Sequence, residues 1–285
     1  MRPIVLSRRE AFTFAAALTA RCAMAQDTAS PLLPLHTAAL EHLGMTVPDP
    51  KAAAEFYGRI FDPQLFQERD PPLRYYVRLG SAYIAFGGTG DPRGGVADAN
   101  QPPRIDHFCV LVKNYKPQEL RAAMVQAGTS MGQGRFGLPT DADGIRLQVA
   151  GAPGGLTRTV MPSARISTDD AALQPIALDH IVLAVSDLER SAAYYAKLFG
   201  PPLSQSKKPE RIWFEIARSR LALEPVSPGN HPGIARVCVK IAGFNRHATP
   251  EKLSKLGAAL LPQNDEHLVR FQDPNGFLIE VTAGT

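Results

Sequence analysis

Stretches in which apolar and polar residues alternate are followed by stretches with helical spacing, and this order occurs twice along the chain. In the first copy this order runs from His42 to Phe61 and in the second from His180 to Phe199, at a constant offset of 138 residues. Each copy predicts a strand that carries a histidine, then a helix that begins after an aspartate and carries an aromatic stripe. The chain is therefore predicted to be an internal duplication, because such units bury their cores only by pairing.

Each copy divides into two halves, separated by loops rich in Gly and Pro. In each half the pattern predicts a strand, a helix and two further strands. The four halves span residues 37–87, 104–150, 176–225 and 233–285.

The two closing strands begin after tight turns that end at Gly144 and Gly276. Asp-Gly and Asn-Gly supply the positive φ that a hairpin turn requires, so the register of both strands is set by the turn. Counted from these glycines, Gln148 and Glu280 occupy the same place. Alternation with a period of two turns Arg146 and Gln148 away from the helices, toward the face where chemistry is expected.

The amino terminus has the pattern of a secretory signal. Arg8 and Arg9 precede the apolar run 11–20, and Ala23-Met24-Ala25 offers a small-x-small cleavage site. The arginine pair resembles a twin-arginine motif, with a plain Sec signal as the alternative. The sequence predicts a signal peptide at 1–25, cleavage near Ala25, linkers at 26–36 and 151–175, and a mature protein in the periplasm.

The net charge and the cysteines of the chain limit the kinds of partner that the protein is expected to bind. Cleavage would remove four arginines and one glutamate, so the net charge would fall from +4 to +1. A nearly neutral protein is not expected to bind nucleic acid, and no membrane association is expected after cleavage. Cys109 and Cys238 lie in equivalent predicted strands, so they are interpreted as small buried side chains rather than a disulfide framework.

The segments 178–183, 194–200 and 271–281 together resemble the vicinal oxygen chelate superfamily, which includes glyoxalases, extradiol dioxygenases, methylmalonyl-CoA epimerases and bleomycin resistance proteins. The resemblance implies an α+β fold. Four βαβββ modules would pair into two cup-shaped eight-stranded mixed sheets, formed by residues 37–150 and 176–285. It also implies a divalent metal ion that chelates two neighbouring oxygens of a small-molecule substrate.

Carried over by position, the family's ligands fall on His42, His107 and Gln148 in the first copy, with Phe86 at the remaining place. Two imidazole nitrogens and one oxygen ligand, which leave coordination positions of the metal open, suit Fe(II), Mn(II) or Zn(II). A neutral His-His-Gln set is expected to hold a metal more weakly than a set that includes a carboxylate.

The second copy offers His180, Glu224 and Glu280, but Arg236 stands where the first copy has His107. A guanidinium cannot ligate a cation and could instead pair with the glutamates. We expect this copy to have lost its metal. The alternative is that Arg236 swings out and the other three still bind one.

The preferred functional hypothesis is a metal-dependent oxygenase of the extradiol type acting in the first copy. One alternative is a metal-free protein that sequesters a small molecule, with Arg146, Arg236 and Lys240 as candidate ligand-binding residues. A glyoxalase-like or epimerase-like enzyme is a second alternative, although Gln148 cannot serve as its base. A scaffold with filled cups is a third. The sequence leaves open whether modules pair within one chain or across a homodimer.

Overall fold

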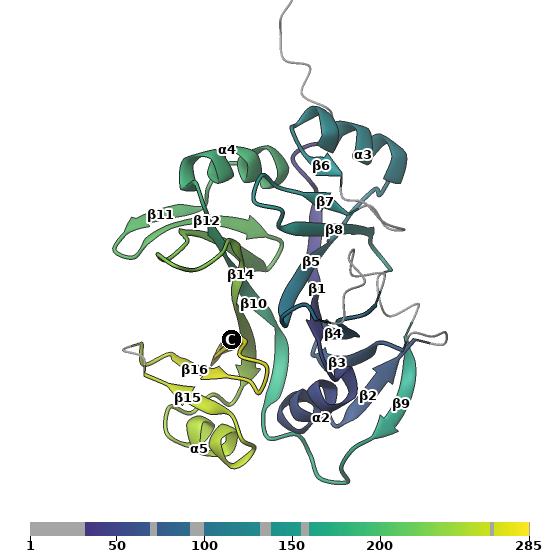
Figure 1. Ribbon diagram of the computed structural model, residues 1–285, viewed down its shortest axis with the longest axis vertical. Helices are drawn as coiled ribbons and strands as arrows, with labels where there is room; N and C mark the ends of the chain where they lie inside the picture. The colour runs from purple at the N-terminus through teal and green to yellow at the C-terminus, as the bar shows by residue number, and fades with distance from the viewer. Residues whose placement is uncertain are drawn as a thin grey trace, which may run out of the picture. The chain divides into compact units, whose positions relative to one another are not determined.

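The computed structural model describes residues 32–68, 73–91, 100–131, 138–154, 160–262 and 265–284 (Figure 1). The expected signal peptide and the first part of the expected linker lie outside these residues. Within the described ranges, none of the helices has the length and apolar character needed to cross a bilayer.

The first sheet has nine strands in the order β6-β7-β8-β5-β1-β4-β3-β2-β9. These strands are β1 (Thr37–Val47), β2 (Gln64–Gln67), β3 (Tyr75–Leu79), β4 (Ala82–Gly88), β5 (Arg104–Val112), β6 (Ser130–Met131), β7 (Pro139–Thr140), β8 (Arg146–Gly151) and β9 (Met161–Arg165). Helices α2 (Pro50–Phe61) and α3 (Pro117–Gln126) belong to the same half of the chain.

The second sheet has eight strands in the order β11-β12-β13-β10-β14-β17-β16-β15. These strands are β10 (Gln174–Val185), β11 (Ser204–Lys207), β12 (Glu210–Ile216), β13 (Ser219–Pro225), β14 (Gly233–Ala242), β15 (Ala259–Leu261), β16 (Leu268–Gln272) and β17 (Leu278–Ala283). Helices α4 (Leu188–Phe199) and α5 (Ala248–Lys255) complete this half.

Each sheet joins two modules through a central antiparallel pair, β1 with β5 and β10 with β14. The opening strand of every module also runs parallel to that module's last strand. The expected fold class, paired βαβββ modules in mixed sheets, is confirmed. The modules pair within one chain.

Strand β9 lies inside the segment 151–175 that was expected to be a linker. It pairs antiparallel with β2 and gives the first sheet its ninth strand. An edge strand presents unpaired N–H and C=O groups, and a passing extended segment can satisfy them. The expected boundary is therefore corrected, because part of this segment is structure rather than linker.

The two long helices begin as the sequence predicts. Asp49 accepts a hydrogen bond from the Ala52 amide and Asp187 accepts one from the Arg190 amide, both at 2.9 Å. These side chains satisfy amides that have no partner within the helix. The aromatic stripes face the core, where Tyr57 and its counterpart in α4 are fully buried.

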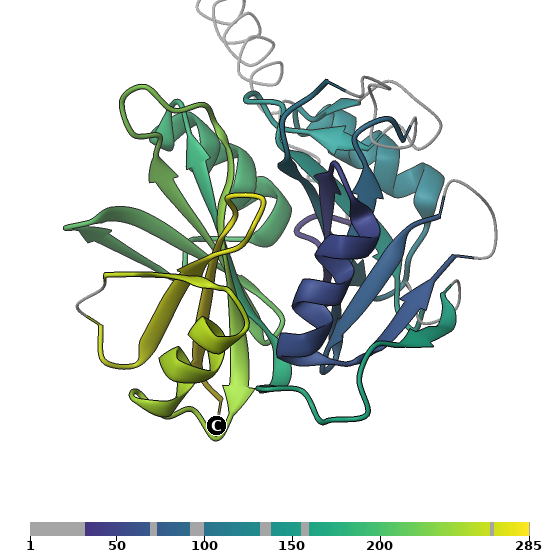
Figure 2. The same ribbon diagram turned by 60° about the horizontal axis from the view of Figure 1, so that its bottom comes forward.

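Residues Leu32–Thr285 form one unit, so contacts between the two sheets are part of the fold. Figure 2 shows the first sheet, in purple to teal, beside the second sheet, in green to yellow, with α2 near the boundary. We call residues 37–150 with β9 domain one, and residues 174–284 domain two. The concave face of each sheet is called its cup.

Candidate functional site

A bulge in β1 brings an acidic side chain beside the first candidate histidine. In the β1–β5 ladder, Leu40 and His42 face consecutive partners, so Glu41 is an extra residue. Neighbouring side chains of a regular strand point to opposite faces, whereas a bulge can turn both to one side. His42 Nδ1 lies 2.8 Å from Glu41 Oε2.

A bulge also places a carboxylate beside two other histidines. Asp106 is the extra residue in β5, and its Oδ2 lies 2.8 Å from His107 Nδ1. Asp179 is the extra residue in β10, and its Oδ2 lies 2.7 Å from His180 Nδ1. Sequence reasoning missed these three carboxylates. The signal was present as three acidic-His dipeptides, but only the bulges make the two side chains of each dipeptide meet.

In domain one, the two candidate histidines converge. His42 Nε2 lies 3.2 Å from His107 Nε2, and both side chains are buried. Burial disfavours the imidazolium and lowers the pKa of His107 to about 4, so this ring is neutral at pH 7. With its Nδ1 against Asp106, the neutral His107 ring directs its Nε2 lone pair toward His42 Nε2. A metal ion between the two Nε2 atoms would accept that lone pair.

Carboxylate–histidine pairs of this kind orient the imidazole ligands of metal ions in proteins. Gln148 is in register with His42 across three strands, because Cys109 of β5 is paired with His42 on one side and with Gln148 on the other. The three predicted ligands of domain one therefore share the concave face. They fit a divalent metal in donor type and placement, with the neutral amide as the weakest member.

Cys109 lies within 4.8 Å of donor atoms of Glu41 and His42, and Cys238 repeats this arrangement beside Asp179 and His180. Both thiols are fully buried, as the sequence predicts. Burial raises the pKa of each thiol well above its usual value. Both are therefore protonated at neutral pH and are poor ligands or nucleophiles.

The cup of domain one has little space beside its histidines. The cavity that reaches His107 has a volume of about 10 Å³, close to the minimum for one water molecule. Tyr76 and Tyr83 are buried on the module that carries His42, with Phe66 packed against them. Tyr83 is paired with His42 in the ladder, so these aromatic side chains lie on the concave face beside the candidate metal position.

Phe86 is not at the remaining ligand place. It lies beside Met45, and its ring packs 5.2 Å from Tyr57 in the core. The residue that corresponds to Glu224 is Gly87, which lies beside Thr46 as Glu224 lies beside Ala184. The prediction was wrong by one position, because the loop between β2 and β3 of domain one, counted between equivalent paired residues, is one residue longer than the loop between β11 and β12 of domain two. A slip of one residue reverses the face of a strand side chain.

The cup of domain two is open and charged. Its cavity has a volume of about 730 Å³. His180, with Nε2 3.4 Å from Glu280, lies on its wall. Trp213 and Arg220 stand where domain one has Tyr76 and Tyr83.

Arginines hold the two candidate glutamate ligands of this cup. Arg236 donates Nη1 and Nη2 to the two oxygens of Glu224, at 2.8 and 2.6 Å, and Arg211 adds a bond of 2.8 Å. Glu280 accepts from Arg270 Nε at 2.9 Å and lies 3.5 Å from Arg236 Nε. Burial alone would raise the pKa of Glu280, but hydrogen bonds from His180 and Arg270 lower it to about 2.

The three candidate ligand-binding residues have different places. Lys240 lies in the cup of domain two, with Nζ 3.1 Å from Asp179, which also pairs with Arg220. Arg236 lines both the metal position of that cup and a second cavity between the domains. Arg146 lies beside His107 at the end of the domain-one cup and also lines the interdomain cavity.

Comparison with known proteins places this arrangement among related folds. Residues 180–282 match the family model described as a glyoxalase-like domain. A variant of 4-hydroxymandelate synthase from Streptomyces coelicolor is similar over 87% of this chain and 92% of its own, with 13% identity and a TM-score of 0.61. The 2,3-dioxygenase LapB from Pseudomonas sp. KL28 is similar over 88% and 93%, with 13% identity and a TM-score of 0.63.

The Mn(II)-bound glyoxalase from Novosphingobium aromaticivorans is similar over 88% of this chain and 83% of its own, with 15% identity and a TM-score of 0.59. At these identities the likeness concerns the fold. It extends over both domains, whereas the family model matches domain two alone.

Proposed function

Since residues 180–282 match the glyoxalase-like domain family and the described chain has the vicinal oxygen chelate fold, we propose that this protein binds a small anionic molecule in the cup of domain two without a metal ion. The observation that carries the proposal is the guanidinium of Arg236, bound to Glu224 and 3.5 Å from Glu280.

The donor set of this cup does not fit a metal. Arg236 and Arg270 place two positive charges against Glu224 and Glu280, the charge that a divalent ion would bring. A guanidinium carries no lone pair for a metal and keeps its charge at any accessible pH. Binding a cation here would require Arg236 to leave two partly buried carboxylates and would add charge repulsion.

The remaining groups favour an anion. Among the described residues that line the cavity, the cationic side chains outnumber the carboxylates, Arg211, Arg220, Lys240 and Arg270 against Asp179, Asp265 and Glu280. Arg211 Nε is also buried without a hydrogen-bond acceptor among the described atoms. An anionic ligand such as a carboxylate would supply acceptors for these donors.

Trp213 is the chain's one tryptophan and lies on this wall, 5.1 Å from the His180 ring, so its fluorescence reports on the cup. We expect benzoate and 4-hydroxyphenylpyruvate to change that fluorescence saturably, with no effect of EDTA, and neutral catechol to bind more weakly. Lys240→Met should weaken binding about tenfold, since one charged hydrogen bond is lost.

Asp179 keeps Arg220 and His180 as partners in that variant, so the fold is expected to persist. Lys255→Met, at an exposed position of α5, is the matched control. A response that requires added metal, or equal binding of the anions and catechol, would contradict the proposal.

A second candidate function is a metal-dependent oxygenase in domain one, favoured by the 3.2 Å approach of His42 Nε2 and His107 Nε2. His42, His107 and Gln148 would hold Fe(II), Mn(II) or Zn(II). Such an ion supplies a Lewis acid and a template for a substrate with neighbouring oxygens. Glu41 and Asp106 would fix the two rings through Nδ1.

Elemental analysis of protein purified without chelators or oxygen tests this candidate. Stoichiometric metal that is lost in His107→Ala but kept in His231→Ala would support it, since His231 lies outside both cups. Protein without metal, and without Co(II) absorption after titration, would exclude the oxygenase.

A further inference from the structure

Gly44 lies directly against the imidazole of His107. The two residues are paired across the β1–β5 ladder. A Cβ atom added to Gly44 would lie 2.1 Å from His107 Cε1 and 2.4 Å from Nδ1, closer than atoms of separate residues can approach. The ring therefore lies across the space that a side chain at position 44 would fill, and among the amino acids only glycine leaves that space open.

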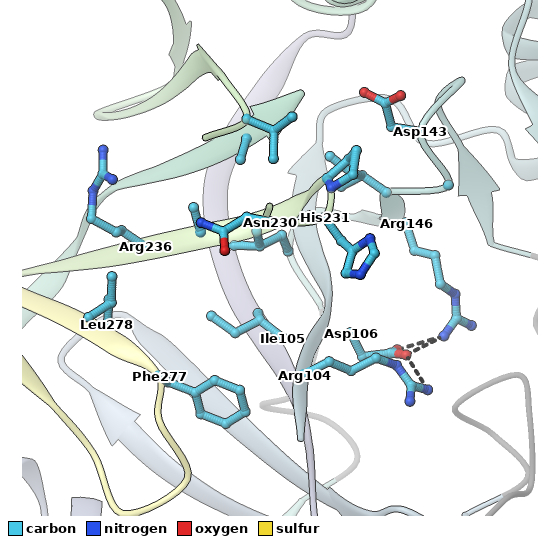
Figure 3. A pocket seen from close by; sticks show the side chains of 18 of the residues that line it. Arg104, Ile105, Asp106, Asp143, Arg146, Asn230, His231, Arg236, Phe277 and Leu278 are labelled. Atoms are coloured by element: carbon cyan, nitrogen blue, oxygen red, sulfur yellow. Dashed lines mark hydrogen bonds and ion pairs between the residues drawn. The ribbon is translucent and has the colours of Figure 1, made fainter. Parts of the chain in front are cut away.

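The other side of this ring is held by a carboxylate. His107 Nδ1 lies 2.8 Å from Asp106, and Arg146 donates to both oxygens of that carboxylate, at 2.7 and 2.6 Å (Figure 3). Asp106 fixes the ring through Nδ1, while Gly44 leaves the space in which the ring lies. In this position His107 Nε2 comes within 3.2 Å of His42 Nε2. The meeting of the two imidazoles thus depends on both neighbours of the ring.

Domain two has a valine at the place of this glycine. Val182 is paired with Arg236 across the β10–β14 ladder, as Gly44 is paired with His107. Val182 is fully buried, so its side chain fills the space over which the imidazole lies in domain one. Arg236 is long enough to reach Glu224 instead, at 2.8 and 2.6 Å.

Three neighbouring positions therefore differ together between the domains. Domain one has Gly44, Gly87 and His107, and domain two has Val182, Glu224 and Arg236. The first set accommodates an imidazole, and the second accommodates a guanidinium with its carboxylate. Replacing the arginine alone would leave the valine side chain against the new ring.

We propose that Gly44 is a positioning residue of the candidate metal centre in domain one, and that Val182 excludes an imidazole from the equivalent place in domain two. The residue at 44 or 182, and not only the residue at 107 or 236, then decides which cup can bring two imidazoles together. The metal-binding role of Gly44 rests on the second candidate function, whereas the placement of the ring does not.

The placement of the ring can be measured in the metal-free full chain. With ¹³C-labelled histidine, a nuclear Overhauser cross-peak is expected between the rings of His42 and His107, whose centroids lie 5.3 Å apart. His42→Gln assigns that cross-peak. Gly44→Ala should remove it, because the added Cβ displaces the ring. Gly233→Ala is the matched control and should keep it, since no atom lies within 4 Å of a Cβ added there. Far-UV circular dichroism checks that each variant folds.

Co(II) absorption tests the same relationship in domain two. All variants carry His107→Ala, so that the signal does not depend on metal binding in domain one. Val182→Gly with Arg236→His should bind Co(II) about tenfold more tightly than Arg236→His alone, the lower end of what correct orientation of a ligand contributes. Val182→Ala with Arg236→His should bind no more tightly than Arg236→His alone, because the Cβ atom remains.

A cross-peak that is absent from the unaltered chain, or that persists in Gly44→Ala, would overturn the role of Gly44. Equal binding of Co(II), or none, with and without Val182→Gly would overturn the role of Val182. An equal gain from Val182→Ala would show that the Cβ atom is not the obstacle and would overturn the equivalence of the two positions. If domain one binds no metal but these results are as expected, the oxygenase is excluded and the placement of the ring by Gly44 stands.

Discussion

The phenol of Tyr57 in α2 donates a hydrogen bond of 3.0 Å to Asp273 Oδ2, which belongs to the last closing turn of the other domain. Tyr195 in α4 repeats this bond with the domains exchanged, at 2.9 Å from Asp141 Oδ2. The other oxygen of each aspartate accepts backbone amides of its own turn. Each turn therefore fixes its own closing strand and the helix of its neighbour.

Tyr57→Phe is expected to destabilise the chain by about 1–3 kcal/mol, because the buried aspartate loses a donor that water cannot replace. Tyr195→Phe should cost a similar amount. Urea unfolding measures both. Tyr115→Phe, at a side chain that is 40% exposed, is the control and should have little effect. Values for Tyr57→Phe and Tyr195→Phe no larger than that of the control would show that the two bonds do not hold the domains together.

The ion pairs of the domain-two cup predict a dependence of stability on pH. The pKa of Glu280 falls from 4.5 to about 2 on folding. A carboxylate with a depressed pKa contributes stability that is complete above pH 4.5 and is lost as the pH falls toward 2. The free energy of unfolding should therefore decrease between pH 5 and 3, and Glu280→Gln should make this decrease shallower. An equal slope in both proteins would contradict the assignment.

Arg236→His is expected to give domain two an affinity for metal. The substitution removes the fixed charge and places an imidazole where domain one has His107, beside His180 and Glu280. Two imidazoles with one carboxylate bind divalent transition metals. Co(II) absorption measures the effect, with Arg236→Gln as the control for the lost charge. If the unaltered chain bound Co(II) at this cup, Arg236 would have to move away from Glu224, and the prediction would be wrong.

We propose that the chain is exported to the periplasm through its twin-arginine-like segment. Replacing Arg8 and Arg9 by lysine should retain the protein in the cytoplasm, because the arginine pair is the recognised feature of such signals. Cell fractionation and amino-terminal sequencing test this, with cleavage expected near Ala25. Continued export of the lysine variant would favour a Sec signal.

The long, strongly patterned elements could be predicted from the sequence. Helices α2 and α4 begin after the expected aspartates, and Gln148 and Glu280 are equivalent as counted from their turns. Short strands such as β2 and β6 were missed, because two to four residues are too few to show a period. Phe86 was misplaced because the loop between β2 and β3, counted between equivalent paired residues, is one residue longer than its counterpart between β11 and β12.

The candidate site was only partly visible. The sequence identified His42 and His107 as a pair and Arg236 as the residue that breaks the equivalence of the copies. It did not show that bulges turn Glu41 and Asp106 beside those histidines. A bulge depends on how two strands pair, which local patterning does not record.

The sequence by itself determined the duplication, the module order and the equivalence of Gln148 and Glu280, because turn chemistry and a period of two are local properties of the chain. Tertiary structure alone decided that aromatic side chains fill the cup of domain one while that of domain two stays open. It also decided that Arg146 lines the cavity between the domains. Cavity volume and ion pairing depend on which distant side chains meet, and only packing of the complete chain sets those meetings.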